Sequence, residues 1–260
     1  TYLMPNRQGQ ISLDDLQAAL RPDTALVSMM LVNNELGCVL PVKEAAALVK
    51  AYDKQILFHT DAVQGFLKVP FTPEGLGVDT LAVSGHKVHA PKGIGAMYIR
   101  KGLKISPFIR GGGQENGLRS GTEPTGQIAA FAVACQTGKA KMAQSLAHMN
   151  ELKAYTLERL HAEVPKVEEI LSGDAPHILA LTLPGYKSEV LVRVMGVCIS
   201  AGSACHRGKA SHVYEVMGLT KPQRDGAFRV SFSDWSTKEE VDCFVQALKE
   251  TQEMLFPTMS

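Results

Sequence analysis

Apolar and polar positions in the first half of the chain predict strands and helices in turn. Residues 26–32 form a continuous apolar run, which is typical of a buried parallel strand. Apolar residues recur at helical spacing over residues 41–52, where Pro41 suits the first turn. Three further strands are predicted at residues 56–59, 80–84 and 95–100. This order indicates an α/β layer with a mainly parallel sheet.

The second half of the chain predicts a long helix and then a smaller α/β segment. The helical pattern covers residues 127–162, and another helix begins at Ser188. A closing helix is predicted over residues 238–254, with an N-cap at Ser236 or Thr237. Four strands are predicted, at residues 167–171, 178–183, 197–200 and 228–232. We expect a boundary inside the long helix, which would give domains of residues 1–142 and 143–260.

Composition narrows the class of protein. Of the 260 residues 45% are hydrophobic and 20% are charged, the balance of an ordinary globular protein. The formal net charge is +1, so charge provides no argument for a nucleic acid or an anionic membrane as partner. No apolar run approaches the roughly 20 residues that a membrane span needs. The start of the sequence shows no signal pattern. The cysteine usage fits reduced thiols, so a cytoplasmic protein is expected.

The cysteines argue against a disulfide framework. Their number is five, which is odd, and no two form a CxxC pair. A zinc site would use Cys198, Cys205, His206 and His212, whose spacing matches no common zinc pattern, so we expect no metal.

Cys205 differs from the other cysteines in its neighbours. It follows a Gly-Ser-Ala segment and precedes His206 and Arg207, and nearby cations favour the thiolate. The other four lie in apolar runs and are expected to be packing residues. Cys205 is therefore the candidate reactive thiol.

Lys87 and Asp61 each follow a predicted strand. A lysine at the carboxyl end of a strand, in a partly dry pocket, can form a Schiff base with an aldehyde, although a single such lysine is commonly a solvated surface residue. Asp61 alone is most simply the N-cap of a helix that it opens. A pyridoxal-phosphate (PLP) enzyme needs a carboxylate at such a position to keep the pyridine nitrogen protonated. Lys87 and Asp61 together could supply both the lysine for the Schiff base and the carboxylate for the pyridine nitrogen.

Arg229 lies on the last predicted strand. Its guanidinium group could bind a carboxylate through two parallel hydrogen bonds, or it could form an ordinary ion pair. The three glycines at residues 111–113 could bind a phosphate, but they are more typical of a flexible turn.

Five motifs in order carry a resemblance to a known family. They are VNNELG, HTDAVQ, SGHKVHAPKGIGAMYIR, GGGQENGLRSGTEP and SAGSAC. Together they resemble cysteine desulfurases of the class V aminotransferase family, PLP enzymes of fold-type I, over essentially the whole chain. The resemblance implies an α/β fold with a mainly parallel-sheet PLP-binding domain and a smaller C-terminal α/β domain.

The resemblance implies a cofactor role for several residues. Lys87 would bind PLP covalently, and Asp61 would pair with the pyridine nitrogen. Gln64 would bond the phenolic oxygen of the cofactor. Ser84 and His86 would bind the phosphate, and His86 would join Lys87 among the catalytic residues.

Four more residues receive roles from the resemblance. Thr122 would reach the phosphate bound by the other subunit of a homodimer. Asn34 would lie near the cofactor and the substrate, and Arg229 would bind the substrate carboxylate. Cys205 would attack the substrate sulfur, keep it as a persulfide and pass it to an acceptor or scaffold protein.

The sequence departs from the family pattern in two ways. Family members carry a phosphate loop and a stacking histidine upstream of the segment that begins at Thr1, so we interpret the chain as truncated at its N-terminus. The residues after Cys205, His-Arg-Gly-Lys, are more basic than is common there.

The resulting hypothesis is a cysteine desulfurase that converts L-cysteine to L-alanine and supplies sulfur for iron–sulfur clusters or other sulfur biosynthesis. Two alternatives remain at this stage. One is a selenocysteine lyase or a related class V lyase or aminotransferase, and the other is a catalytically silent, truncated fragment.

Overall fold

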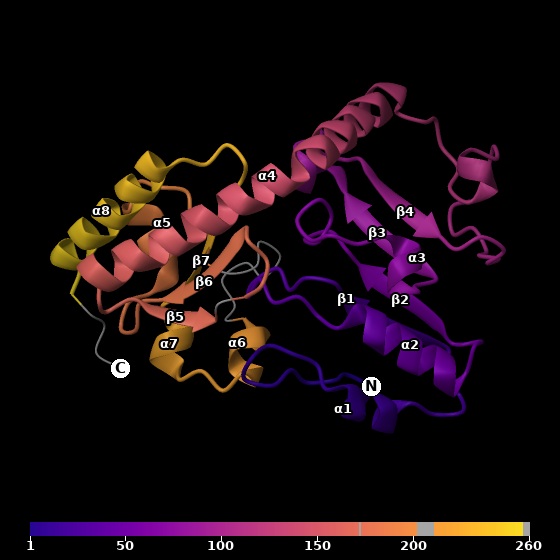
Figure 1. Ribbon diagram of the computed structural model, residues 1–260, viewed down its shortest axis with the longest axis horizontal. Helices are drawn as coiled ribbons and strands as arrows, with labels where there is room; N and C mark the ends of the chain where they lie inside the picture. The colour runs from indigo at the N-terminus through magenta and orange to yellow at the C-terminus, as the bar shows by residue number, and fades with distance from the viewer. Residues whose placement is uncertain (172, 202–210, 257–260) are drawn as a thin grey trace. The chain divides into compact units, whose positions relative to one another are not determined.

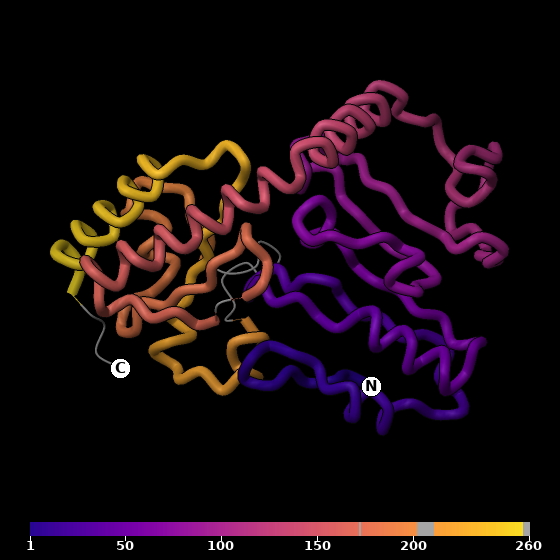
Figure 2. Tube along the Cα trace, viewed as in Figure 1, coloured from indigo at the N-terminus to yellow at the C-terminus, as the bar shows by residue number. Residues whose placement is uncertain are grey.

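The computed structural model describes residues 1–171, 173–201 and 211–256 (Figure 1). The chain forms two compact units. Leu20–Leu31 and Val42–Lys141 make up the first, which we call the parallel-sheet unit. The second, the antiparallel-sheet unit, consists of Thr1–Ala19, Val32–Pro41 and Met142–Ser260. Figure 2 lets the reader follow the chain through these alternating segments.

The parallel-sheet unit contains a four-stranded sheet in the order β1-β2-β3-β4. Strand β2 pairs in parallel with β1 and β3, whereas β4 pairs antiparallel to β3. The mainly parallel α/β fold is therefore confirmed. The strands are β1 (Leu26–Met30), β2 (Leu57–Asp61), β3 (Thr80–Ser84) and β4 (Gly95–Ile99). The helices are α2 (Val42–Tyr52), α3 (Pro73–Leu76) and the 3-10 turns η1 (Gly85–Val88) and η2 (Glu115–Gly117).

Helix α2 covers part of this sheet and contacts β1 and β2. Its buried positions Val42, Ala45, Ala46 and Val49 recur at helical spacing, so one face of the helix is apolar and turns inward. Phe58, the second residue of β2, is fully buried. The predicted helix over residues 41–52 thus forms because its apolar face has a sheet to cover.

Strand β1 is less buried than its apolar run predicts. Only Met29 is buried, while Leu26 and Met30 are exposed to 57% and 38%. Within the described residues β1 is the first strand of its sheet and pairs only with β2. A strand with one neighbour is less covered than a central one, so the expectation of a fully buried strand is wrong here.

The antiparallel-sheet unit has a three-stranded sheet in the order β5-β6-β7. Its strands are β5 (Glu168–Leu171), β6 (Ile178–Thr182) and β7 (Ala227–Ser231). Helix α4 (Thr125–Glu163) begins in the parallel-sheet unit and ends in this one. The other helices are α1 (Leu13–Ala19), α5 (Ser188–Val194), α6 (His212–Val216), α7 (Lys221–Asp225) and α8 (Lys238–Met254).

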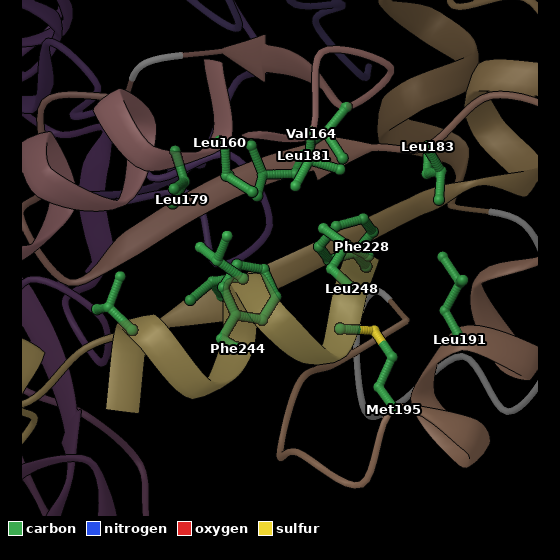
Figure 3. Packing of buried hydrophobic residues seen from close by; sticks show 14 of the residues in the cluster. Leu160, Val164, Leu179, Leu181, Leu183, Leu191, Met195, Phe228, Phe244 and Leu248 are labelled. Atoms are coloured by element: carbon green, nitrogen blue, oxygen red, sulfur yellow. The ribbon is translucent and has the colours of Figure 1, made fainter. Parts of the chain in front are cut away.

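A hydrophobic core joins this sheet to α4 and α8. All five residues of the central strand β6 are buried. Helix α8 supplies Phe244 and Leu248, and Phe244 packs on Phe228 of β7 with 6.4 Å between ring centroids (Figure 3). The capping box of Thr237 and Glu240 begins α8 at the predicted position.

Three expectations about secondary structure and domains need comment. In the described part of the chain residues 197–200 form no strand, and Ser200 makes an isolated bridge with Arg229. The two compact units place residues 1–19 and 32–41 with the C-terminal part. The division into domains 1–142 and 143–260 therefore stays a prediction.

Among the described residues, no helix is both long and apolar enough to cross a membrane.

Candidate active site

The parallel-sheet unit collects polar side chains at one edge of its sheet. Asp61 is the last residue of β2 and Ser84 is the last residue of β3. The two strands are parallel neighbours, with Asp61 in register with Ala82, so their carboxyl ends meet at the same edge. Parallel sheets bind ligands at this edge.

Asp61 caps the segment that follows β2. Its Oδ1 accepts a hydrogen bond of 2.9 Å from the main-chain N–H of Val63. The segment forms turns instead of the helix that we expected Asp61 to open. Leu67 has a φ of 58°, and this left-handed backbone interrupts a right-handed helix. Gln64 lies half-buried within these turns.

Ser84, His86 and Lys87 lie where β3 passes into η1. The hydroxyl of Ser84 and Nδ1 of His86 share a hydrogen bond of 2.8 Å, and both His86 and Lys87 are exposed. The glycine between them has a structural reason. A Cβ on Gly85 would lie 2.8 Å from the Ile94 side chain and 3.0 Å from its carbonyl oxygen.

The donor set at this edge fits a phosphorylated pyridine aldehyde. Lys87 offers an amine, Asp61 a carboxylate, and Ser84 and His86 a hydroxyl and an imidazole. An aldehyde can react with the amine, and a ring nitrogen can pair with the carboxylate. A phosphate can accept hydrogen bonds from the hydroxyl and the imidazole. Thr122 is exposed in the loop that precedes α4.

The antiparallel-sheet unit holds a tight turn at residues 33–38. The side-chain oxygen of Asn33 accepts hydrogen bonds from the N–H groups of Glu35 and Leu36, both 2.9 Å long. Gly37 has a φ of 75°, and a Cβ there would lie 2.9 Å from the Cβ of Ile178. Its carbonyl accepts a hydrogen bond of 2.8 Å from Ala175. The turn is therefore fixed to the body of this unit.

Arg229 reaches this turn from strand β7. Its Nη1 donates a hydrogen bond to the main-chain carbonyl of Asn34, while its own main chain bonds Ser200 in both directions. The structure thus brings together the two residues that we expect to bind substrate, although their roles stay predictions.

Sequence reasoning missed Glu35 and Tyr214, which lie near Arg229. Glu35 is 3% exposed and Tyr214 is 2% exposed. Burial raises the pKa of Tyr214, the charge of Glu35 adds to that rise, and Arg229 opposes it. Burial lowers the pKa of Arg229, and Tyr214 and Glu35 oppose that change. Within its motif Glu35 is the ionisable residue, a signal that could have been followed, whereas the sequence around Tyr214 offers none.

Cys205, His206 and Arg207 lie outside the described residues. Cys38 is buried, its thiol donates to the carbonyl of Gly9, and burial raises its pKa to about 11. Cys198 and Cys243 are exposed, so the expectation that they are packing residues is wrong. Their apolar neighbours in the sequence do not determine which way each thiol faces.

No group of three or more His, Cys, Asp or Glu residues that could hold a metal ion occurs in the described parts of the chain.

The fold and the polar edge together define a class. A mainly parallel sheet that presents a lysine, a carboxylate, a hydroxyl and an imidazole at its carboxyl edge is typical of PLP enzymes of fold-type I. The family model described as aminotransferase class-V matches residues 1–244. The chain belongs to the class V aminotransferase family.

Relatives with assigned names refine this comparison. The chain is 36% identical over 264 aligned residues to a protein named cysteine desulfurase from Nostoc sp., and the match covers 98% of this chain and 65% of that protein. A solved structure described as a NifS-like protein is similar with a TM-score of 0.91 and 34% identity, over 98% of this chain and 68% of that one.

A third relative is known with a ligand. The solved structure described as SspA in complex with cysteine has a TM-score of 0.72 and 31% identity, covering 91% of this chain and 67% of that one. The chain spans about 65% of the length of the first relatives that it matches.

Proposed function

We propose that the protein is a PLP-dependent cysteine desulfurase, which converts L-cysteine to L-alanine and retains the sulfur as a persulfide. The observation that carries the proposal is the parallel pairing of β2, which ends at Asp61, with β3, which leads directly into the turn η1 that contains Lys87. Similarity to a protein named cysteine desulfurase, and to one solved with cysteine, supports the choice of substrate.

The edge of the parallel sheet would hold the cofactor. Lys87 would bind PLP covalently, and the carboxylate of Asp61 would keep the pyridine nitrogen protonated. Gln64 would bond the phenolic oxygen, and Ser84 and His86 would bind the phosphate. When bound, PLP supplies an electron sink that weakens bonds around the substrate α-carbon.

The turn at residues 33–38 and strand β7 would hold the substrate. The planar guanidinium group of Arg229 matches the two oxygens of an α-carboxylate. Asn34 would place its side chain beside the substrate while its carbonyl holds Nη1 of Arg229. These contacts would orient L-cysteine before any bond changes.

Cys205 would receive the sulfur. The thiolate would attack the substrate sulfur, the carbon–sulfur bond would break, and a proton would complete the methyl group of L-alanine. L-cysteine and one thiol thereby become L-alanine and one persulfide. The persulfide would then pass to an acceptor or scaffold protein, for iron–sulfur clusters or other sulfur biosynthesis. Thr122 would contact the phosphate of a second copy in a homodimer.

A lysine substitution tests the cofactor assignment. Borohydride reduction of PLP-loaded protein, followed by peptide mass mapping, should place the cofactor on Lys87. Lys87→Ala should abolish both the attachment and alanine formation, whereas the control Lys92→Ala should retain both. Cofactor found on another lysine would refute the assignment.

A cysteine substitution tests the sulfur step. Cys205→Ser should still bind L-cysteine but should deliver no persulfide sulfur, whereas Cys243→Ser, which removes an exposed thiol elsewhere, should behave as the parent. Turnover of selenocysteine in preference to cysteine would favour a selenocysteine lyase instead.

A further inference from the structure

Lys153 is a buried lysine to which the proposed mechanism assigns no role. It lies on helix α4, within the antiparallel-sheet unit, and only 7% of its surface is exposed. Lysine is rarely buried to this degree unless its ammonium group is paired. The role of Lys153 therefore depends on the groups that its Nζ contacts.

The ammonium group of Lys153 binds two main-chain carbonyls that lie between strands β5 and β6. Nζ donates one hydrogen bond to the carbonyl of Gly173 and a second, of 3.3 Å, to the carbonyl of Ala175. An ammonium group has three donors and no acceptor, so a single lysine can hold two carbonyls at once. Burial lowers the pKa of Lys153, and the charges of Glu169 and Asp174 oppose that change.

The segment at residues 173–175 lies directly against the turn at residues 33–38. The N–H of Ala175 donates a hydrogen bond of 2.8 Å to the carbonyl of Gly37. A Cβ on Gly173 would overlap the carbonyl carbon of Gly37, so the two main chains touch without a side chain between them. Main-chain atoms cannot move aside as a flexible side chain can, so the position of this segment determines the position of the turn.

The turn in its place supports the candidate substrate site. The carbonyl of Asn34 accepts a hydrogen bond from Nη1 of Arg229, the group proposed to bind the substrate carboxylate. Hydrogen bonds and main-chain contacts thus lead without interruption from Lys153 to that guanidinium group. Binding groups act well only when their supporting residues hold them within about 0.5 Å of the productive geometry.

We propose that Lys153 is a positioning residue, which fixes the segment at residues 173–175 and thereby holds the turn at residues 33–38 in the place required to bind the carboxylate of an amino-acid substrate. This inference rests on the proposed function. Without the ammonium group, the carbonyls of two buried residues would lose their donor and the segment would shift to find another. The turn would then lose its support at Gly37.

The main experiment uses Lys153→Met, which keeps the length of the side chain and removes its donors. In the PLP-loaded protein this variant should raise KM for L-cysteine by about 3- to 10-fold and change kcat by less than about 2-fold. The inhibition constant of L-alanine, which has the carboxylate, should rise by a similar factor. That of cysteamine, which lacks the carboxylate, should stay unchanged.

Lys249→Met is the matched control. It makes the same substitution in the same unit, at a lysine whose Nζ donates a hydrogen bond of 2.9 Å to Oε2 of Glu163. KM for L-cysteine should remain that of the parent. An equal rise of KM in both variants would indicate a general loss of stability and would overturn the inference.

Amide exchange tests the positioning role without catalysis. The N–H of Ala175 reports on the contact with Gly37, and the N–H of Leu36 reports on the turn itself. Lys153→Met should speed the exchange of both by about 10-fold, and the control should leave both unchanged. Lys153→Gln keeps an N–H donor on a side chain one atom shorter, so it should show a smaller change and provides the measurement if Lys153→Met does not fold. Equal exchange in parent and variants would overturn the inference.

Arg229→Ala separates failure of the inference from failure of the proposed function. If Arg229→Ala leaves KM for L-cysteine unchanged, the proposed substrate site fails, and amide exchange still decides whether Lys153 holds the turn. If Arg229→Ala raises KM and Lys153→Met does not, the positioning role is overturned while the proposed function stands.

Discussion

Each of the two units contains a buried charged residue, and the hydrogen bonding of that residue differs between the units. In the parallel-sheet unit Asp79 is fully buried, and its carboxylate accepts hydrogen bonds from Lys50 (2.6 Å), Arg100 (2.7 Å) and the N–H of Phe58 (2.7 Å). Burial alone would raise the pKa of Asp79, but the bonds from Lys50, Phe58 and Arg100 together lower it.

The antiparallel-sheet unit contains buried polar atoms without hydrogen-bond partners among the described residues. Glu35, Tyr214 and Arg229 each keep a buried atom without a partner among the described residues. A network that is fully satisfied within the protein adds to rigidity and stability, whereas an unsatisfied one retains binding capacity at the expense of stability. The comparison therefore predicts that changes at Asp79 affect folding and that changes at Arg229 affect ligand binding.

The largest expected effect is on folding. Asp79→Ala should lower the free energy of unfolding by about 3 kcal/mol, because it leaves the N–H of Phe58 and two cations without their acceptor. Urea unfolding measures this loss. Asp23→Ala, which breaks an exposed pair with Arg21, should change stability little. A KM for L-cysteine that rises in folded Asp79→Ala would contradict the division of roles.

The stabilisation from Asp79 should depend on pH. The pKa of Asp79 in the folded state lies below its ordinary value of 3.8, so its contribution is complete above that pH. It is lost as the pH falls through the lower, folded-state pKa. The difference in stability between parent and Asp79→Ala should thus be constant from neutral pH to about 5 and shrink at lower pH. A difference that grows on acidification would disagree with a lowered pKa.

The next largest expected effect is a loss of activity in Arg229→Lys. Lysine keeps the charge but lacks the planar pair of donors, so kcat/KM for L-cysteine should fall by about 10- to 100-fold, or about 1.5–3 kcal/mol. Steady-state kinetics measures the fall, and urea unfolding should show a smaller change in stability. Unchanged kinetics would assign Arg229 a structural role instead.

The smallest effect should come from Tyr214→Phe on folding. The hydroxyl has no partner among the described residues, so its removal should change the free energy of unfolding by less than about 0.5 kcal/mol. A loss of more than about 1.5 kcal/mol in urea unfolding would show that the hydroxyl is paired in solution. The two units would then be alike.

The local pattern of apolar and polar residues was sufficient to predict most of the secondary structure. The apolar spacing of residues 41–52 and 238–254 predicted α2 and α8 to within a residue, because amphipathic helices record their buried face in the sequence. The strand that ends at Ser84 was also predicted, whereas β2 continues two residues beyond the predicted strand of residues 56–59 and so includes Asp61. The five motifs in order were enough to indicate the family.

Tertiary structure decided the features that depend on distant partners. Residues 197–200 have the composition of a strand, but in the described part of the chain their pairing is an isolated bridge between Ser200 and Arg229. Leu67 adopts a left-handed backbone that stops the helix expected after Asp61. Proximity of Glu35, Tyr214 and Arg229 could not be predicted, because periodicity reports which face of an element is buried and not which other element covers it.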